Sequence, residues 1–529
     1  MLDNNSSSAS PKPLFDMTSS EGVNDSERIL TKLCQRSFLR LWSQTNVFTD
    51  EGFKEGKGRT KELCDALVIF GDDVIIFSDK HVKYQADREL HVAWPRWYRR
   101  TVLDSCKQLY GAKSWLMRFP ERAFLDAKCS RKLPIAVPSG PNVRFHLVAV
   151  TRGSRDAVLA HNGGDGLGSI ALNSALEGDA HFTAPFMLGR PVPERAFVHV
   201  FDEVSVELVM KELDTAVDFL DYLRARDELL GRSGCQVIAP GEEELLAAYL
   251  RTMDRTGARH VFIDVGPEDG LPDLAMFDGS QYEGLYQDPG YLRKKEADRI
   301  SYEWDALIDR FLTYGDPNIH ARALDQTSAE TEQGLRLLAA ESRFQRRQLA
   351  ESFIGALERV EPGMRLGRVV NRQAPGETVF VFLVMPMRDE RDYADYREHR
   401  MAVLHAYVRT ARLKAAGGTT FVGIAFDNPH KSYRGGSEDL FVFSQDTWTK
   451  DELTELETMQ RDLGLWRENT VEWRCRQDEY PQASQANPQQ LLKTDDLKSS
   501  QVRVNNARKV EKRRQKMQQL SRRRNRGRK

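Results

Sequence analysis

The sequence lacks most features that mark secreted, membrane-bound or zinc-binding proteins. Its six cysteines are scattered without a Cys-x-x-Cys pair, which fits a reducing compartment and argues against structural zinc. No run of about 18 uninterrupted apolar residues occurs, so we expect no membrane span. The N-terminal stretch 4–10 is polar and lacks the apolar centre of a signal peptide. These absences together predict a cytoplasmic protein.

Net charge is small only as an average. The 529 residues carry a formal net charge of −1, but Arg503–Lys529 contain thirteen Lys and Arg residues and one acid, so the rest of the chain carries −13. A dense cationic tail attracts phosphate polymers regardless of their sequence. We therefore expect nucleic acid, and DNA in particular, as the partner. The tail residues expected to contact it are Arg513, Arg514, Arg522, Arg523 and Arg524.

Other interpretations of the tail stay open. It could bind ribosomes or an acidic protein, act as a targeting signal, or contact the acidic body of its own chain.

Length and composition predict a multidomain protein of the α/β class. Hydrophobic residues make up 40% of the chain, which is enough for real cores. We expect a disordered segment at 1–22, an α/β domain at 23–235, a second α/β domain with long helices at 236–475, and a polar, then strongly basic and disordered tail at 476–529. The residues of the second domain do not indicate its role.

The most informative stretch is Glu62–Lys80, which is typical of a β-hairpin. Two apolar, largely β-branched or aromatic segments, 67–70 and 74–77, flank Gly71-Asp72-Asp73, a turn signal. A two-residue loop at Gly71-Asp72 places Asp65 opposite Ser78, and a loop at Asp72-Asp73 places it opposite Lys80. Since side chains alternate with period 2, either loop puts Asp65, Ser78 and Lys80 on one face and Asp79 on the other, whereas a three-residue loop would bring Asp79 in.

A carboxylate and a lysine at the end of such a hairpin resemble the PD-(D/E)xK nuclease superfamily, in particular its restriction-endonuclease-like and nuclease-related branches. The family motif is an acid on one strand followed by (D/E)-x-K on the next. Asp65 matches the first acid and Lys80 the lysine, but Ser78 stands where the family has Asp or Glu. The resemblance implies a restriction-endonuclease-like α/β sandwich and Mg²⁺- or Mn²⁺-dependent cleavage of DNA, in restriction or genome defence.

The resemblance also assigns roles to further residues. Asp65 would bind the metal, which prefers oxygen ligands, and Lys80 would position the attacking water. Glu62, or Glu27 in a helix that opens near Asp25 or Ser26, would complete the metal shell. On a helix after the hairpin, Lys107 or Gln108 fits the place of a further family residue, and Gln108 would assist catalysis. Glu27 has an alternative role as an acid in a first helical turn, where the helix dipole favours it.

Two neighbouring stretches offer phosphate contacts. Residues 43–61 read as a basic loop, which either touches a phosphate backbone or is plain solvated surface. Arg96, Arg99 and Arg100 lie among the aromatic residues Trp94, Trp97 and Tyr98. They would stack on or neutralise nucleic acid, or else the aromatics form core and the arginines a solvated face.

The rest of the chain predicts a regular alternation of elements. In the first domain we expect strands at 144–151 and 196–201 and a helix at 204–230. In the second we expect strands at 260–264, 377–386, 419–426 and 439–443, and helices at 290–314, 327–359 and 392–416.

Three functional hypotheses follow. The first is an active Mg²⁺-dependent endonuclease. The second is a catalytically inactive protein of the same fold that binds nucleic acid or a protein partner, with Ser78 marking lost metal affinity. The third is an unrelated protein whose hairpin merely ends in charged residues, where a surface pair is worth under about 1 kcal/mol.

Overall fold

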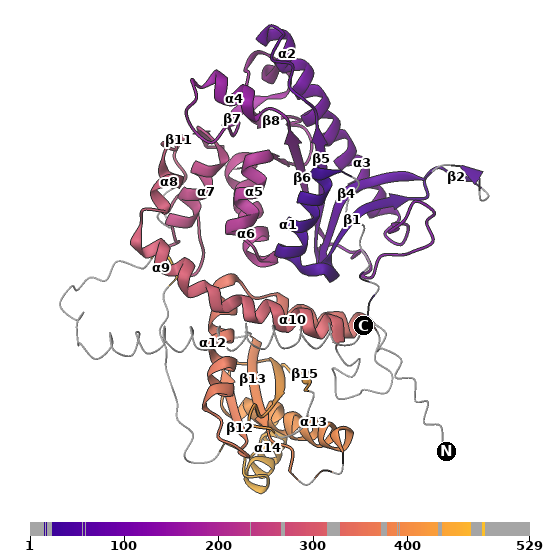
Figure 1. Ribbon diagram of the computed structural model, residues 1–529, viewed down its shortest axis with the longest axis vertical. Coiled ribbons are helices and arrows are strands. Elements are labelled where there is room, and N and C mark those ends of the chain that lie inside the picture. The colour runs from indigo at the N-terminus through magenta and orange to yellow at the C-terminus, as the bar shows by residue number, and fades with distance from the viewer. Residues whose placement is uncertain are drawn as a thin grey trace, which may run out of the picture. The chain divides into compact units, whose positions relative to one another are not determined.

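The fold was analysed in a computed structural model that describes Phe15, Met17 and residues 24–54, 57–58, 60–232, 234–265, 270–314, 328–371, 378–388, 390, 392–431, 436–466 and 479–481. Three sheets of four or five strands and a two-stranded ribbon alternate with helices (Figure 1). The mixed α/β class is therefore confirmed. Within these residues no helix is both long and apolar enough to cross a membrane.

Several predictions cannot be followed further in the structure. Apart from Phe15 and Met17, the N-terminal segment 1–22 lies outside the described residues, and so does the tail from residue 482 on, with the five arginines expected to contact nucleic acid.

The first sheet has the predicted hairpin near its centre. Its strands lie in the order β1, β4, β5, β6, β9. β1, β4 and β5 are antiparallel neighbours, whereas β6 and β9 run parallel to β5, as the expected third strand should. The strands are β1 (Ser43–Thr49), β4 (Lys61–Phe70), β5 (Asp73–His81), β6 (Arg144–Arg152) and β9 (Val198–Asp202).

The hairpin turns through two residues. Phe70 pairs with Asp73, and Gly71 adopts the left-handed φ of +61° that a tight hairpin turn requires. The register runs to Ala66 opposite Phe77, so Asp65 stands opposite Ser78. The first of the two tight registers considered from the sequence is confirmed.

Helices cover both faces of this sheet. On one face, the Phe38 ring of α1 (Asp25–Trp42) lies 6.4 Å from the Phe77 ring of β5 and 5.5 Å from the Phe219 ring of α6 (Ala216–Asp227). On the other face, Ser78 hydrogen-bonds to Ser105 of α3 (Asp104–Arg118). Because successive strand residues point to opposite faces, the sheet is sandwiched between helix layers.

A continuous helical segment leads into α3. The helix α2 (Leu90–Tyr98) passes into a π-helical turn, η1 (Arg99–Leu103), and then into α3, with right-handed helical backbone at each junction. A π turn holds one residue more than an α turn and often accompanies functional sites.

The expected loop at 43–61 is wrong in its first part, because residues 43–49 form the strand β1. Its start is polar, Ser43-Gln44-Thr45-Asn46, which hides the strand from sequence reading. Two of these side chains bond to the preceding helix: Ser43 Oγ donates to the Leu39 carbonyl at 2.8 Å and Gln44 Nε2 to the Arg40 carbonyl at 3.0 Å. The side chains of 53–59 lie outside the described residues.

The helix expected at 204–230 is two helices, α5 (Glu203–Glu212) and α6. Thr215 ends the connection between them, because its hydroxyl accepts from the Asp218 N–H and so caps α6.

The strand expected at 260–264 is also wrong. An isolated bridge joins His260 to Met253, and the rings of His260 and Phe262 pack 5.5 and 5.1 Å from Tyr249 of α7 (Glu242–Arg251). The apolar residues there serve helix packing instead of strand pairing. The second sheet has the order β11 (Leu274–Met276), β10 (Gln236–Ala239), β7 (Ala171–Glu177), β8 (Met187–Arg190).

The third sheet confirms the pattern expected for the second domain. Its order is β12 (Leu366–Val370), β13 (Thr378–Met385), β14 (Thr420–Asp427), β15 (Glu438–Ser444), and α13 (Tyr393–Thr410) connects the parallel pair β13 and β14. Sequence reasoning missed β12. α13 is fixed to the sheet by the fully buried Arg400, which forms ion pairs with Asp427 and Asp439.

The long helices expected at 290–314 and 327–359 occur as shorter pieces. They are α9 (Pro289–Ala297), α10 (Tyr302–Tyr314), α11 (Ser328–Ala339) and α12 (Arg343–Arg359).

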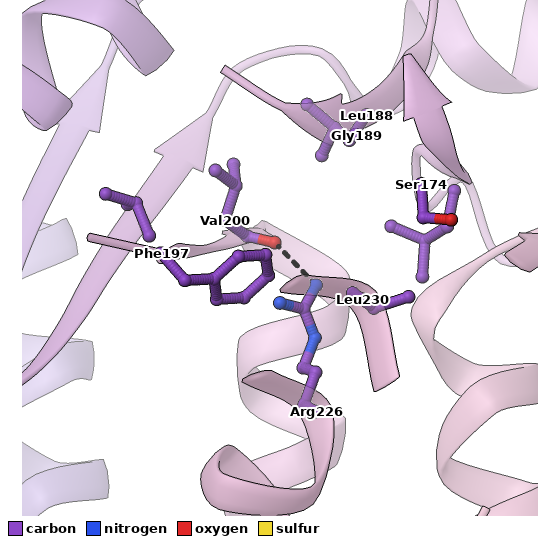
Figure 2. Close-up of a pocket in the computed structure, with 9 residues that line it drawn as sticks. Ser174, Leu188, Gly189, Phe197, Val200, Arg226 and Leu230 are labelled. Carbon is purple, nitrogen blue, oxygen red and sulfur yellow. Dashed lines mark hydrogen bonds between the residues drawn. The ribbon is translucent and has the colours of Figure 1, made fainter. Parts of the chain in front are cut away.

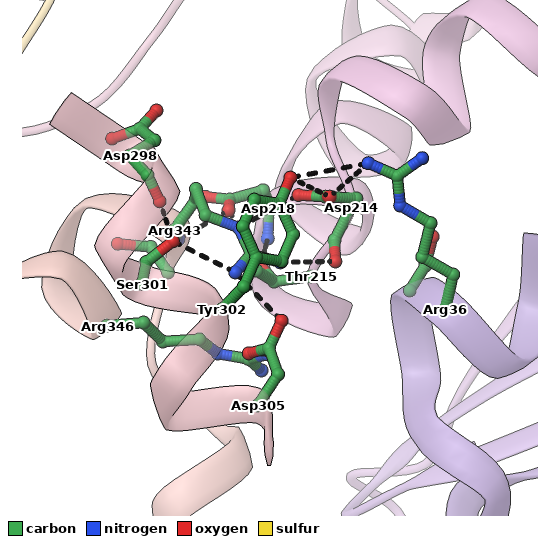
Figure 3. A network of polar contacts seen from close by, with 12 residues as sticks. Arg36, Asp214, Thr215, Asp218, Asp298, Ser301, Tyr302, Asp305, Arg343 and Arg346 are labelled. Carbon is green, nitrogen blue, oxygen red and sulfur yellow. Dashed lines mark hydrogen bonds and ion pairs between the residues drawn. The ribbon is translucent and has the colours of Figure 1, made fainter. Parts of the chain in front are cut away.

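A buried polar network fixes α10 and α12 beside α1 and α6 (Figure 3). The Asp214 carboxylate accepts from Arg36 Nη2 at 2.9 Å, Tyr302 Oη at 2.7 Å and Arg343 Nε at 2.9 Å. Burial opposes its ionisation, but Arg343, Tyr302 and Arg36 outweigh that and hold the pKa of Asp214 below its ordinary value. Asp305 pairs with the other side of Arg343.

We expect Asp214→Ala to lower the free energy of unfolding by about 3–5 kcal/mol, because it leaves the buried guanidinium of Arg343 with one carboxylate fewer. Chemical denaturation measures the loss. The matched control is Glu177→Ala, whose half-exposed carboxylate pairs with Arg190 at 2.9 Å and should cost at most about 1 kcal/mol. Equal losses in the two variants would show that the network does not hold these helices.

Candidate functional site

The candidate site lies at the open, polar end of the β4–β5 hairpin, beside the start of α1. Asp65 is buried, with 8% of its surface exposed. Its Oδ2 accepts the backbone N–H of Asp79 at 2.8 Å, which fixes the carboxylate on the strand pair. Burial raises the pKa of Asp65, Lys80 and the Asp79 N–H lower it, and Glu27 raises it further.

Glu62 belongs to the same electrostatic cluster. Glu62 is exposed, but desolvation by the surrounding protein raises its pKa to about 6; Asp65 and Glu27 contribute in the same direction, and Lys80 opposes them. Glu27 enters from the first turn of α1, where the actual N-cap is Asn24, one residue before the predicted Asp25 or Ser26. Glu27 and Lys80 therefore both lie within electrostatic range of Glu62 and Asp65.

Ser78 is the residue in the position of the missing acid, and it faces the protein interior. It is fully buried, and its hydroxyl hydrogen-bonds to Ser105 Oγ at 3.1 Å and to Gln108 Oε1 at 3.0 Å. Gln108 thus reaches the hairpin from α3, as the resemblance implied, but its side-chain oxygen accepts the hydrogen bond of the Ser78 hydroxyl.

Asp79 points to the opposite face of the sheet, as the tight hairpin predicts. Its carboxylate accepts from Arg152 Nε at 3.0 Å, and both side chains are at most 5% exposed. Burial raises the pKa of Asp79 to about 6 even though Arg152 lowers it. Asp79 is therefore committed to an internal ion pair and does not replace the acid missing at Ser78. Sequence reasoning missed Arg152, because nothing near it in the chain points to Asp79.

The cluster does not have the geometry of a metal site. Among the described residues, no group of three or more His, Cys, Asp or Glu side chains is placed to hold a metal ion. Asp65 uses one oxygen on a backbone N–H, Asp79 is paired, and the Ser78 hydroxyl is a neutral and weak ligand. The described residues at this site therefore do not fit Mg²⁺.

The arginines near α2 form an exposed cationic group. Arg96, Arg99 and Arg100 are all exposed, whereas the neighbouring Trp94 and Trp97 are at most 2% exposed. The second of the two sequence interpretations is confirmed for the aromatic residues, which are core.

A small cavity elsewhere in the fold can hold one water molecule. It measures about 10 Å³ and lies between the first two sheets, next to the buried Arg226 (Figure 2). Arg226 pairs with Glu242 at 2.8 Å and donates to the Val200 carbonyl at 3.4 Å. The cavity is too small for an organic substrate.

No protein-family model matches the chain, and no curated protein or solved structure shows significant similarity to it.

The carboxylate cluster makes a titration prediction. Because Asp65 raises the pKa of Glu62, Asp65→Asn should bring that pKa down from about 6 toward the ordinary value, and Lys80→Met should move it further up. Carbon-detected NMR titration of the Glu62 carboxyl measures both shifts.

The matched control is Lys61→Met. Lys61 is the neighbour of Glu62 in sequence, but its ammonium pairs with Glu51 at 2.9 Å, so the Glu62 titration should not move. If the pKa of Glu62 stays the same in both Asp65→Asn and Lys80→Met, the hairpin end does not form this cluster.

Proposed function

We propose that residues 23–235 form a restriction-endonuclease-like domain that binds nucleic acid without the metal-dependent cleavage of the family it resembles. The observation that carries the proposal is the burial of Ser78. At the position of the family's second acid, the side chain is neutral and hydrogen-bonded to α3. The order helix, antiparallel strands, helix, parallel strand supports the fold part of this proposal.

Nucleic acid is the proposed ligand because the chain offers two groups of cations. Arg96, Arg99 and Arg100 are exposed on consecutive turns of α2 and η1, where they can reach neighbouring phosphates. The thirteen basic residues of Arg503–Lys529 add sequence-independent attraction. The remaining body is acidic, so any phosphate affinity must come from these local groups.

An active Mg²⁺- or Mn²⁺-dependent DNA endonuclease is the second candidate. It is favoured by the convergence of Glu27, Glu62, Asp65 and Lys80, since carboxylates whose pKa is raised by one another attract cations. In that case Asp65, Glu62 and Glu27 would be the ligands of the metal.

Restoring the missing acid tests the first proposal. We expect millimolar Mg²⁺ to leave the melting temperature of the wild type unchanged. Ser78→Asp should lower it in chelator, because the new carboxylate is buried beside Asp65, and Mg²⁺ should raise it again. Ser78→Asn is the neutral control and should not respond to Mg²⁺. Thermal unfolding with and without metal measures these shifts.

The opposite result would support the second candidate. Mg²⁺ would then stabilise the wild type, and the wild type would cleave duplex DNA. Cleavage would disappear in Asp65→Ala and in Lys80→Ala.

The arginines make a separate prediction about salt. Each phosphate contact contributes about 0.9 to the slope of log affinity against log salt, so replacing Arg96, Arg99 and Arg100 together by Ala should flatten that slope by up to about 3. Fluorescence anisotropy with labelled DNA over a salt series measures it.

The matched control removes three exposed cations far from α2 in sequence: Arg299, Lys450 and Arg461. Its slope should stay within error of the wild type. Equal flattening in both triple variants would show that the protein senses only its total charge.

A further inference from the structure

The strand β11 forms an open edge of the second sheet (Figure 1). In the described part of the chain, its one strand neighbour is β10, which runs parallel to it. β10 bonds to the Asp273 carbonyl and to the Phe277 N–H, which lie on the same side of β11. Because backbone groups alternate between the two sides of a strand, the N–H and C=O groups of Leu274 and Met276 point to the other side. They face the open edge, where a further strand can pair with them.

The exposed face of β11 is apolar. Leu274 and Met276 are two residues apart, so their side chains share a face, and they are 47% and 68% exposed. Ala275 and Phe277 point to the opposite face, where they pack against the main hydrophobic core. Edge strands in natural proteins are commonly protected from further pairing by a lysine or another charged side chain. The three residues of β11 carry no charge, so its edge lacks that protection.

The chain around β11 is acidic and has no strongly basic side chain. Residues 260–292 contain seven Asp and Glu residues and no Lys or Arg. Two of these acids, Asp273 and Asp278, are exposed near the two ends of β11. A strand that pairs with this edge therefore meets an apolar centre with a carboxylate near each end.

We propose that β11 is a docking edge for an extended, basic segment of a partner protein, which adds a strand to the second sheet. Main-chain hydrogen bonds to Leu274 and Met276 hold the segment. Its apolar side chains, at alternate positions, pack on the exposed face of β11, and its Lys or Arg residues pair with Asp273 and Asp278. The edge lies outside residues 23–235, so this inference is independent of the nucleic-acid proposal.

A second copy of this chain fits the edge less well than a basic partner. An antiparallel pair of β11 strands would gather acids of both copies at each end, Asp273 from one copy and Asp278 from the other. Like charges across a strand pair are destabilising. A basic segment replaces this repulsion by attraction at both ends.

The test uses the full chain and a labelled peptide, Lys-Val-Lys-Val-Lys-Val-Lys, with uncharged termini. Fluorescence anisotropy measures its affinity. We expect the same peptide with methylated backbone nitrogens to bind at least about tenfold more weakly, because methylation removes the donors to β11 and leaves the charge unchanged. A Glu-Val peptide of the same length, which has the opposite charge, should not bind.

Two protein variants locate the peptide. Met276→Lys places a cation on the apolar face of the edge, so it should weaken binding of the Lys-Val peptide at least about fivefold. The matched control is Met117→Lys, because Met117 on α3 is 63% exposed and the variant adds the same charge elsewhere. It should leave the affinity unchanged. Circular dichroism checks that both variants fold.

The remaining outcomes overturn the inference. If the methylated peptide binds as tightly, or if both variants weaken binding equally, no strand is added at β11. Self-association in sedimentation experiments that Met276→Lys abolishes would identify a second copy as the occupant. A photo-cross-link from position 276 to a distant segment of its own chain would identify that segment instead. None of these results bears on nucleic-acid binding.

Discussion

The buried ion pair between Asp79 and Arg152 determines what the polar end of the hairpin can do. Both side chains are enclosed, so separating them would leave an uncompensated charge inside the protein. The pair ties β5 to the neighbouring parallel strand β6. It also holds the backbone of Asp79 where its N–H fixes the Asp65 carboxylate. The ion pair thus helps to position Asp65 in the candidate site and keeps the Asp79 carboxylate out of it.

The hairpin could be predicted because its information is local. Two continuous apolar segments and a Gly-Asp turn specify both the strands and the face that Asp65 shares with Ser78. The strand β1 could not be predicted in the same way. Its polar residues read as loop, and they become strand-compatible only when α1 supplies carbonyl acceptors. Likewise, the apolar run at 260–264 looks like a strand until Tyr249 is packed against it.

In the candidate site too, some contacts follow from local sequence and others depend on tertiary packing. Glu62, Asp65 and Lys80 lie on two adjacent strands, so their proximity follows from the turn alone. Arg152 reaches Asp79 across 73 residues of chain, and no periodicity announces such a contact. Whether Glu27 lies near Glu62 and Asp65 depends on how α1 packs against the sheet. The sequence alone shows that Ser78 stands where the resembled family has an acid. Only the contacts with Ser105 and Gln108 show that its hydroxyl is turned inward.

The π turn between α2 and α3 sets the spacing between the exposed arginines and Gln108. The exposed arginines lie before or within it, and Gln108, which meets Ser78, lies after it on the same helical rod. Each residue of a helix advances the rod by about 100° and 1.5 Å, so the extra residue sets the angular phase between them. Removing one residue from Arg99–Leu103 would therefore rotate the exposed arginines by about 100° relative to Gln108. The π turn is a fixed angular offset between the exposed arginines and the hairpin end.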